Sequence, residues 1–229
     1  MLSVTLHELK KQMKSIKSII VVFIIFAVTV GVAAGVKRYA AFIDMQPGND
    51  VYTTGLMLTI LFAGPLFTLS LSHNIINEEM KTRTIRFIAT KTSRTNIIIG
   101  KYLSIVIFWF ICLLVSLLLI MIFAHQFYFV RGFSLFSFVT YFIGLTILLS
   151  TLIKNPLVTN LLGIFLSIMF TVVGIWSAVS HNILLKIISF ITPYHYLFYE
   201  NTSLFAVGPI LISIIFVIIS ILVMRKRDL

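Results

Sequence analysis

The sequence predicts an all-α integral membrane protein, a single domain over residues 1–229 with six transmembrane helices. The first observation is composition: 59% of the residues are hydrophobic and only 11% are charged, against roughly 25% charged residues in a soluble domain. The second is that apolar residues gather in stretches of about 18 or more, which is enough to cross a bilayer. The single cysteine, Cys112, falls inside such a stretch, so we expect it to be a small packing residue.

Residues 2–17 have the pattern of an amphipathic helix that lies on the inner surface of the membrane. Apolar residues recur at steps of three and four, and charged residues occupy the other face. A cleaved signal peptide is the alternative, but its apolar core spans only roughly 7–15 residues. We therefore expect 19–36 to be an uncleaved first span, closed by Lys37 and Arg38. The apolar face carries Leu2, Leu6, Leu9, Met13 and Ile16, and the charged face carries Glu8, Lys10, Lys11, Lys14 and Lys17.

The later spans follow from the same reading of apolar stretches and polar links. Gly64 and Pro65 lie in the middle of the second span and should kink it. Residues 180–206 are apolar but too interrupted for a span, so we expect an outer segment of one or two short re-entrant helices. We expect its tyrosines Tyr194, Tyr196 and Tyr199 at the level of the lipid headgroups. The predicted spans are 51–74, 102–124, 133–153, 157–179 and 207–224.

Residues 77–101 form the longest charged run of the chain and separate the second and third spans. With the N-terminus inside, most of the Lys and Arg residues fall on the inner side. The exceptions are Lys37, Arg38, Arg131 and Lys186. The positive-inside rule therefore places this segment and both termini in the cytoplasm, with the spans in the inner or plasma membrane. The net charge of +11 is spread along the ends of spans, so we expect anionic lipid and not nucleic acid as its partner.

The chain shows no energy source of its own. No charged residue lies in the central part of a predicted span, where ion-coupled carriers usually need one. The sequence also has no P-loop pattern, no metal-binding pattern and no clustered carboxylates of a hydrolase. We expect this chain to bind no cofactor and to have no enzymatic activity, so that energy reaches it through another polypeptide. The segment 77–101 is then the natural receiver.

The same segment resembles the cytoplasmic loop of ABC-2 type permeases, the membrane subunits of a large class of ATP-binding cassette exporters. That loop has Glu, then Gly-Thr, an apolar helix, Thr-Pro-x-Ser-Arg, and Gly-Lys before the third span. Arg83 and Lys91 depart from the pattern, because glycine and proline are usual there. The segment Ile191–Leu197, with its proline before the last span, also resembles the family. The matching residues are Glu79, Thr84, Ile85, Phe87, Ile88, Thr90, Ser93, Arg94, Gly100 and Lys101.

The resemblance implies a subunit that works as a homodimer or heterodimer with two ATP-binding subunits. ATP and Mg²⁺ would bind to those partners. A short coupling helix after Glu79 would sit in a groove of the ATPase. Apolar side chains would anchor it and arginines would pair with acidic residues at the rim. The alternative is a solvated basic loop that touches lipid headgroups. The residues implied in coupling are Glu79, Thr84, Ile85, Arg86, Phe87, Ile88 and Arg94.

The sequence suggests a pathway for cargo along the second and fifth spans. Walls without fixed charge and rich in Phe suit an apolar or amphipathic cargo. The small build resembles permeases that export antimicrobial or toxin peptides, such as exporters of phenol-soluble modulins. Lipids, drugs and ions are also handled by this family, and ordinary helix packing is the alternative role for these side chains. A membrane scaffold, a lipid-modifying enzyme and an ion-coupled carrier are the competing functions. The candidate pathway residues are Phe62, Gly64, Pro65, Phe165, Phe170 and Trp176.

Overall fold

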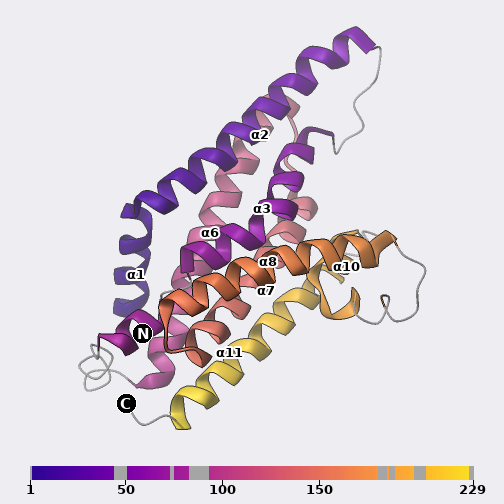
Figure 1. Cartoon of the computed structure of the whole chain (residues 1–229). Coiled ribbons are helices and arrows are strands. Elements are labelled where there is room, and N and C mark those ends of the chain that lie inside the picture. The colour runs from indigo at the N-terminus through magenta and orange to yellow at the C-terminus, as the bar shows by residue number, and fades with distance from the viewer. Residues whose placement is uncertain are drawn as a thin grey trace.

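The computed structural model describes residues 2–43, 51–72, 75–82, 93–179, 185, 189–198 and 205–226. Within these ranges every regular element is a helix (Figure 1). Six of the helices are long and apolar enough to cross a membrane, which confirms the predicted all-α fold. The described helices are, in chain order, α1 (Leu2–Lys14), α2 (Ile16–Ile43), η1 (Val51–Thr53), α3 (Thr54–Ser72), α4 (Asn77–Lys81), α6 (Arg94–Ala124), α7 (Phe129–Leu152), α8 (Pro156–Val179), α10 (Pro193–Phe198), η2 (Phe205–Val207) and α11 (Gly208–Lys226).

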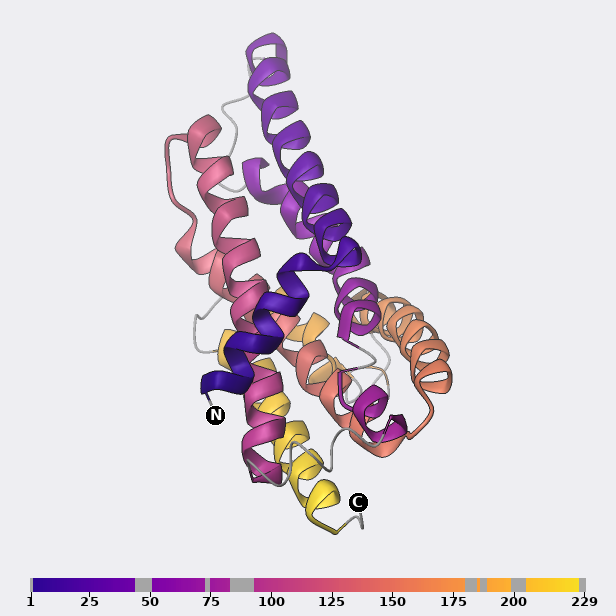
Figure 2. The ribbon, with the colours of Figure 1, turned by 90° about the vertical axis from the view of Figure 1, so that its left-hand side faces the viewer.

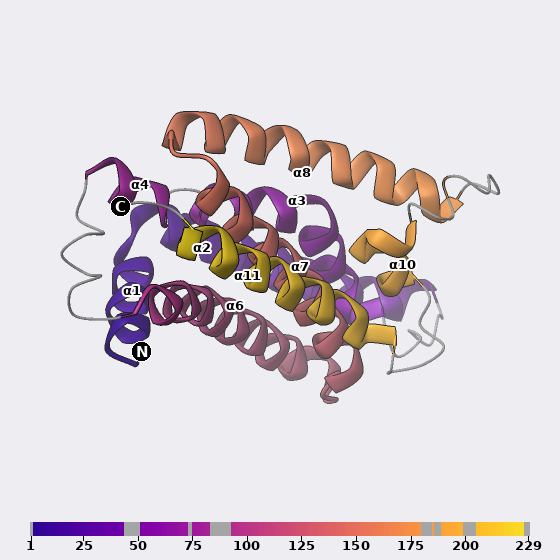
Figure 3. The ribbon, with the colours of Figure 1, turned by 90° about the horizontal axis from the view of Figure 1, so that it is seen from below.

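One end of the bundle gathers most of the exposed basic side chains among the described residues, and we call it the basic end. Figure 3 shows α1, α4 and the C-terminal end of α11 there, with α10 at the opposite end. Figure 2 shows α1 crossing α6 instead of continuing the line of α2. This arrangement agrees with a helix that lies along a membrane surface. The exposed basic residues that define this end are Lys10, Lys11, Lys14, Lys81, Arg225 and Lys226.

Several helix ends differ from the prediction. The helix at 2–17 stops at Lys14, and α2 starts at Ile16 and runs through Lys37 and Arg38 to Ile43. The third span begins at Arg94 and not at Tyr102, because the Ser93 side chain accepts the N–H of Asn96 and caps the helix. The last part of the charged segment 77–101, from Arg94 on, is therefore helix α6 and belongs to the bundle.

Helix α7 is the centre of the bundle. In its most apolar window 78% of the residues are buried, against 22% in α2 and in α8. Its neighbours approach closely because small residues line it: a Cβ at Gly144 would lie 2.8 Å from the Ser213 backbone of α11. The Ser213 hydroxyl also donates to the Thr140 carbonyl at 2.7 Å. The sequence does not predict a central place for this span.

Helix α3 continues through Pro65, and Figure 1 shows it bending between its two halves, as the sequence predicts. In the outer segment, the Tyr194 side chain does not point out toward headgroups. It is fully buried in the bundle, with its hydroxyl 3.1 Å from the Leu61 carbonyl oxygen. That carbonyl is available because Pro65 has no N–H to donate to it. Tyr196 is half-buried, and Tyr199 lies outside the described residues.

Candidate functional site at the basic end

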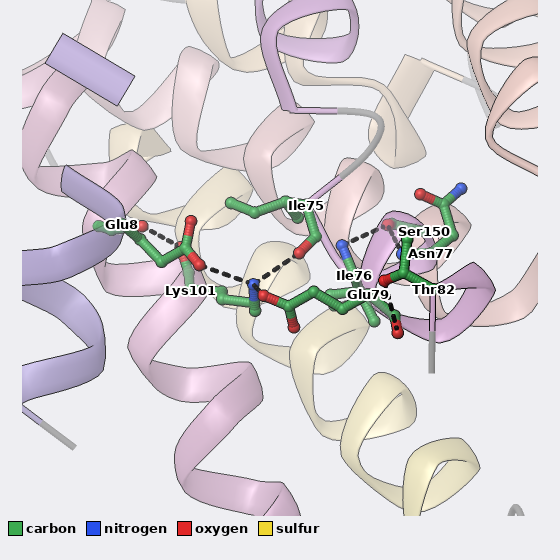
Figure 4. Close-up of polar contacts among 9 residues, drawn as sticks. Glu8, Ile75, Ile76, Asn77, Glu79, Thr82, Lys101 and Ser150 are labelled. Atoms are coloured by element: carbon green, nitrogen blue, oxygen red, sulfur yellow. Dashed lines mark hydrogen bonds and ion pairs between the residues drawn. The ribbon is translucent and has the colours of Figure 1, made fainter. Parts of the chain in front are cut away.

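The basic end is built around a lysine that the bundle encloses. The side chain of Lys101, on α6, is only 2% exposed. Its ammonium lies 2.9 Å from Glu8 Oε1 of α1 and 2.7 Å from Glu79 Oε1 of α4. It also donates to the Ile75 carbonyl at 2.7 Å, so each of its N–H groups has an acceptor (Figure 4). We call these three side chains the Lys101 clamp, since they join α1, α4 and α6.

Burial of this charge depends on both glutamates. An isolated ammonium inside a protein is strongly unfavourable, and a buried charge is tolerated only when it is paired and hydrogen-bonded. The Glu8 and Glu79 side chains are themselves 12% and 18% exposed, so water screens them only in part. The clamp therefore favours one arrangement of the three helices over others. Moving α4 away would leave Lys101 short of an anion.

A second set of polar contacts holds α4 to α7 and α8. The hydroxyl of Ser150, on α7, accepts the N–H groups of Ile76 at 3.1 Å and Asn77 at 3.3 Å. The Asn77 amide donates to Thr159 Oγ1, on α8, at 2.7 Å. Ser150 thus caps a short helix from a distant part of the chain. The start of α4 is fixed against two long helices.

The start of α6 is fixed to α11. Arg94 Nη1 donates to the carbonyl oxygens of Met224 at 3.2 Å and Arg225 at 3.3 Å. A cation at this place also complements the negative end of the α11 dipole. In return Arg225 donates to Thr95 Oγ1 at 3.2 Å. Arg94, predicted to pair with acidic residues of a partner, is thus bound to this chain's own last helix.

These contacts lie on either side of residues 83–92. The preceding helix, α4, is attached to α1, α6, α7 and α8, and the following helix, α6, is attached to α11. A force on 83–92 would therefore reach most of the bundle through short polar contacts. The predicted coupling residues Thr84, Ile85, Arg86, Phe87 and Ile88 lie outside the described residues, while Glu79 and Arg94 stand at the two anchored ends.

The candidate pathway residues do not come together as one surface. Gly64 and Pro65 are buried, and Phe170 packs edge-on against Phe142 with ring centroids 6.0 Å apart. Three others point out of the bundle: Phe62 is 53% exposed, and Phe165 and Trp176 are each 63% exposed. The first group is part of the core, and the second lies on the outer surface of the bundle.

Sequence reasoning missed the partners in the clamp and the anchors of α4. Glu8 was placed on the charged outer face of its helix, but it turns toward α6 while Lys10 and Lys11 stay exposed. Ser150 and Asn77 carried no prediction. The one available signal was a lone carboxylate among the lysines of residues 2–17, which suggests a specific cationic partner.

No family model matches the sequence, and no curated protein is significantly similar to it.

Proposed function

We propose that this chain is the membrane subunit of an ATP-driven exporter of the ABC-2 type. It works as a dimer, with an identical or sibling permease, and each bundle receives movement from an ATPase that binds ATP and Mg²⁺. The basic end faces the cytoplasm, in keeping with the distribution of Lys and Arg.

One observation supports this proposal most: the chain is attached to the bundle on both sides of residues 83–92. Glu79 meets Lys101 before it, and Arg94 meets the end of α11 after it. A loop that only lay on headgroups would not need buried ionic attachment to several helices. A segment that transmits movement from a partner would need such attachment, because a weakly attached segment would move without moving the bundle.

The sequence of 83–92 supplies a suitable contact surface. Ile85, Phe87 and Ile88 offer an apolar anchor, and Arg83 and Arg86 offer charges for an acidic rim. Aromatic and arginine side chains are the residues that most often dominate binding at protein interfaces. An ATPase groove with apolar floor and acidic edge is the partner that fits.

The cargo we propose is apolar or amphipathic, and an antimicrobial or toxin peptide is the favoured class. Phe165 and Trp176 lie on one exposed face of α8, eleven positions apart and hence at nearly the same angle around the helix. In a dimer this face of α8 would look toward the second bundle or toward lipid. Either position gives an uncharged surface along which such a cargo could move.

Site-specific photocrosslinking tests the proposed contact. A photoreactive phenylalanine analogue at position 87 should, in the native host, form an adduct with a protein that carries a P-loop and hydrolyses ATP. The matched control is the same analogue at position 127, since Phe127 is exposed in the link at the opposite end. An adduct at position 87 with lipid alone would contradict the proposal and favour a scaffold or a lipid-modifying enzyme. Transport that follows a proton or sodium gradient without nucleotide would favour an ion-coupled carrier.

A further inference from the structure

The break in α3 leaves one backbone carbonyl without its helical donor. In an α-helix the carbonyl of Leu61 would accept the N–H of residue 65, but Pro65 has no N–H. Pro65 and Gly64 are both buried, so this carbonyl faces protein and not bulk water. A buried carbonyl without a partner is unfavourable, so it requires a donor from elsewhere.

Tyr194 of α10 is that donor. Its hydroxyl lies 3.1 Å from the Leu61 carbonyl oxygen and 2.9 Å from Thr171 Oγ1 of α8. The side chain is fully buried. Burial raises the pKa of Tyr194, so the hydroxyl stays protonated and can donate.

The ring of Tyr194 fills a recess between α7 and α8. A Cβ at Gly174 of α8 would lie 2.2 Å from the ring, so only glycine leaves room there. Phe138 of α7 meets the ring edge-on, with centroids 5.0 Å apart and an angle of 89°. Phe138 also approaches Gly64, whose Cβ would lie 3.8 Å from it. One side chain of α10 thus touches α3, α7 and α8 together.

We propose that Tyr194 is a latch: a positioning residue that holds α10 against the Pro65 break and releases it when the two halves of α3 change their angle. The proposal rests on the proposed function, in which movement of the ATPase reaches α4 and the bundle through residues 83–92. Helix α3 precedes α4 directly in the chain, and Figure 3 places α10 at the end opposite to α4. A proline break allows the two halves of a helix to tilt separately. Tyr194 would therefore couple movement of α4 at the basic end to α10 at the opposite end.

A double-mutant experiment tests the latch in the isolated chain. Tyr194→Phe removes only the hydroxyl, and Pro65→Ala returns an N–H to the Leu61 carbonyl. We expect Tyr194→Phe to speed hydrogen exchange in α10 roughly tenfold, as the loss of one good buried hydrogen bond would. In the Pro65→Ala background the same change should have less than half that effect on a logarithmic scale. Equal effects in both backgrounds, or no effect of Tyr194→Phe, would overturn the proposal.

Two further variants separate the latch from a general loss of packing. Tyr196→Phe is the matched control, because its hydroxyl bonds to the Phe190 carbonyl at 3.0 Å within the same segment. It should leave exchange in α3 unchanged. Gly174→Ala keeps the hydroxyl but displaces the ring, and it should loosen α10 as Tyr194→Phe does. If Tyr194→Phe aggregates, Gly174→Ala carries the test, and normal protection of α10 in that variant would contradict the latch.

Coupling to transport is a separate readout in the complex with the ATPase. Trapping the complex with ATP and vanadate should increase exchange in α10 of the wild type. Tyr194→Phe should show the same fast exchange with and without trapping, because its latch is already open. A trapped wild type whose α4 changes while α10 stays protected would refute the coupling. Failure to isolate any ATPase would refute the proposed function alone, since the isolated-chain test needs no partner.

Discussion

A lysine buried in a helical bundle needs anions at hand, and Lys101 has two. Its ammonium is held between Glu8 and Glu79, which are far from it in sequence. Replacing such a set with apolar residues is often harmless, whereas removing one member alone is strongly unfavourable. The clamp is therefore better understood as fixing one arrangement of helices than as adding stability.

Removing the cation should destabilise the protein more than neutralising the whole clamp. Lys101→Met leaves two carboxylates facing each other, and we expect a loss of about 3 kcal/mol or more in the free energy of unfolding. Adding Glu8→Gln and Glu79→Gln should restore most of that loss. Equilibrium unfolding in mixed micelles measures both. A single variant as stable as the wild type, or no recovery in the triple variant, would contradict the role given to these residues.

At this scale the sequence predicts the kinds of residue better than their partners. The pattern around Gly100 and Lys101 is visible in the sequence, but the helix start at Ser93 was not predicted. The partner Glu8 is not, because its pairing depends on how α1 packs on α6. Tyr194 was misplaced for the same reason: its acceptor is a carbonyl that Pro65 releases in a distant helix.

At the scale of single elements, some helices are stabilised mainly by tertiary contacts and not by their own sequence. Helix α4 covers only Asn77–Lys81, too short to be stable alone. Its first N–H groups are satisfied by Ser150 of α7 and its Asn77 amide by Thr159 of α8. The helix exists because its surroundings accept its polar groups.

Ser150→Ala should therefore loosen α4 without unfolding the bundle. Two buried N–H groups would lose their acceptor, so we expect hydrogen exchange in α4 to rise roughly tenfold. Ser116→Ala is the matched control, because the buried Ser116 hydroxyl bonds only within its own helix, to the Cys112 carbonyl at 2.9 Å. Similar exchange in α4 for both variants would show that Ser150 does not hold it.

Long elements were predictable because composition alone determines them. Six apolar stretches become six helices, but their ends shift where polar contacts intervene. Helix α6 extends back to Arg94 because Ser93 caps it and α11 receives Arg94. The Ser93 cap is local, whereas the contact of Arg94 with α11 joins segments distant in sequence, and apolar periodicity carries no sign of either.

The whole molecule has a basic end and an opposite end, and the proposed function depends on which side of the membrane each occupies. Sequence predicts the number of spans and, through its charges, the orientation. It does not predict that α7 is central, because all the spans are similarly apolar. Once the structure is known, the buried small residues of α7 explain its central position.

Sidedness can be measured with cysteines in a Cys112→Ser background. The variant Thr90→Cys should react with a membrane-impermeant maleimide only after cells are opened, because residue 90 would lie in the cytoplasm. The variant Gln126→Cys, in the exposed link between α6 and α7, should react in intact cells. The reverse pattern would place the basic segment outside and remove the basis for an ATPase partner.

The most direct test of the account is ATP hydrolysis by the complex isolated from its native membrane through this chain. We predict a vanadate-sensitive ATPase activity that copurifies with the wild type. It should be lost with Phe87→Asp and kept with Phe127→Asp, the matched change at the opposite end. A wild-type chain that brings no ATPase activity, or a Phe87→Asp chain that keeps it in full, would contradict the claim that a partner drives this bundle through its basic segment.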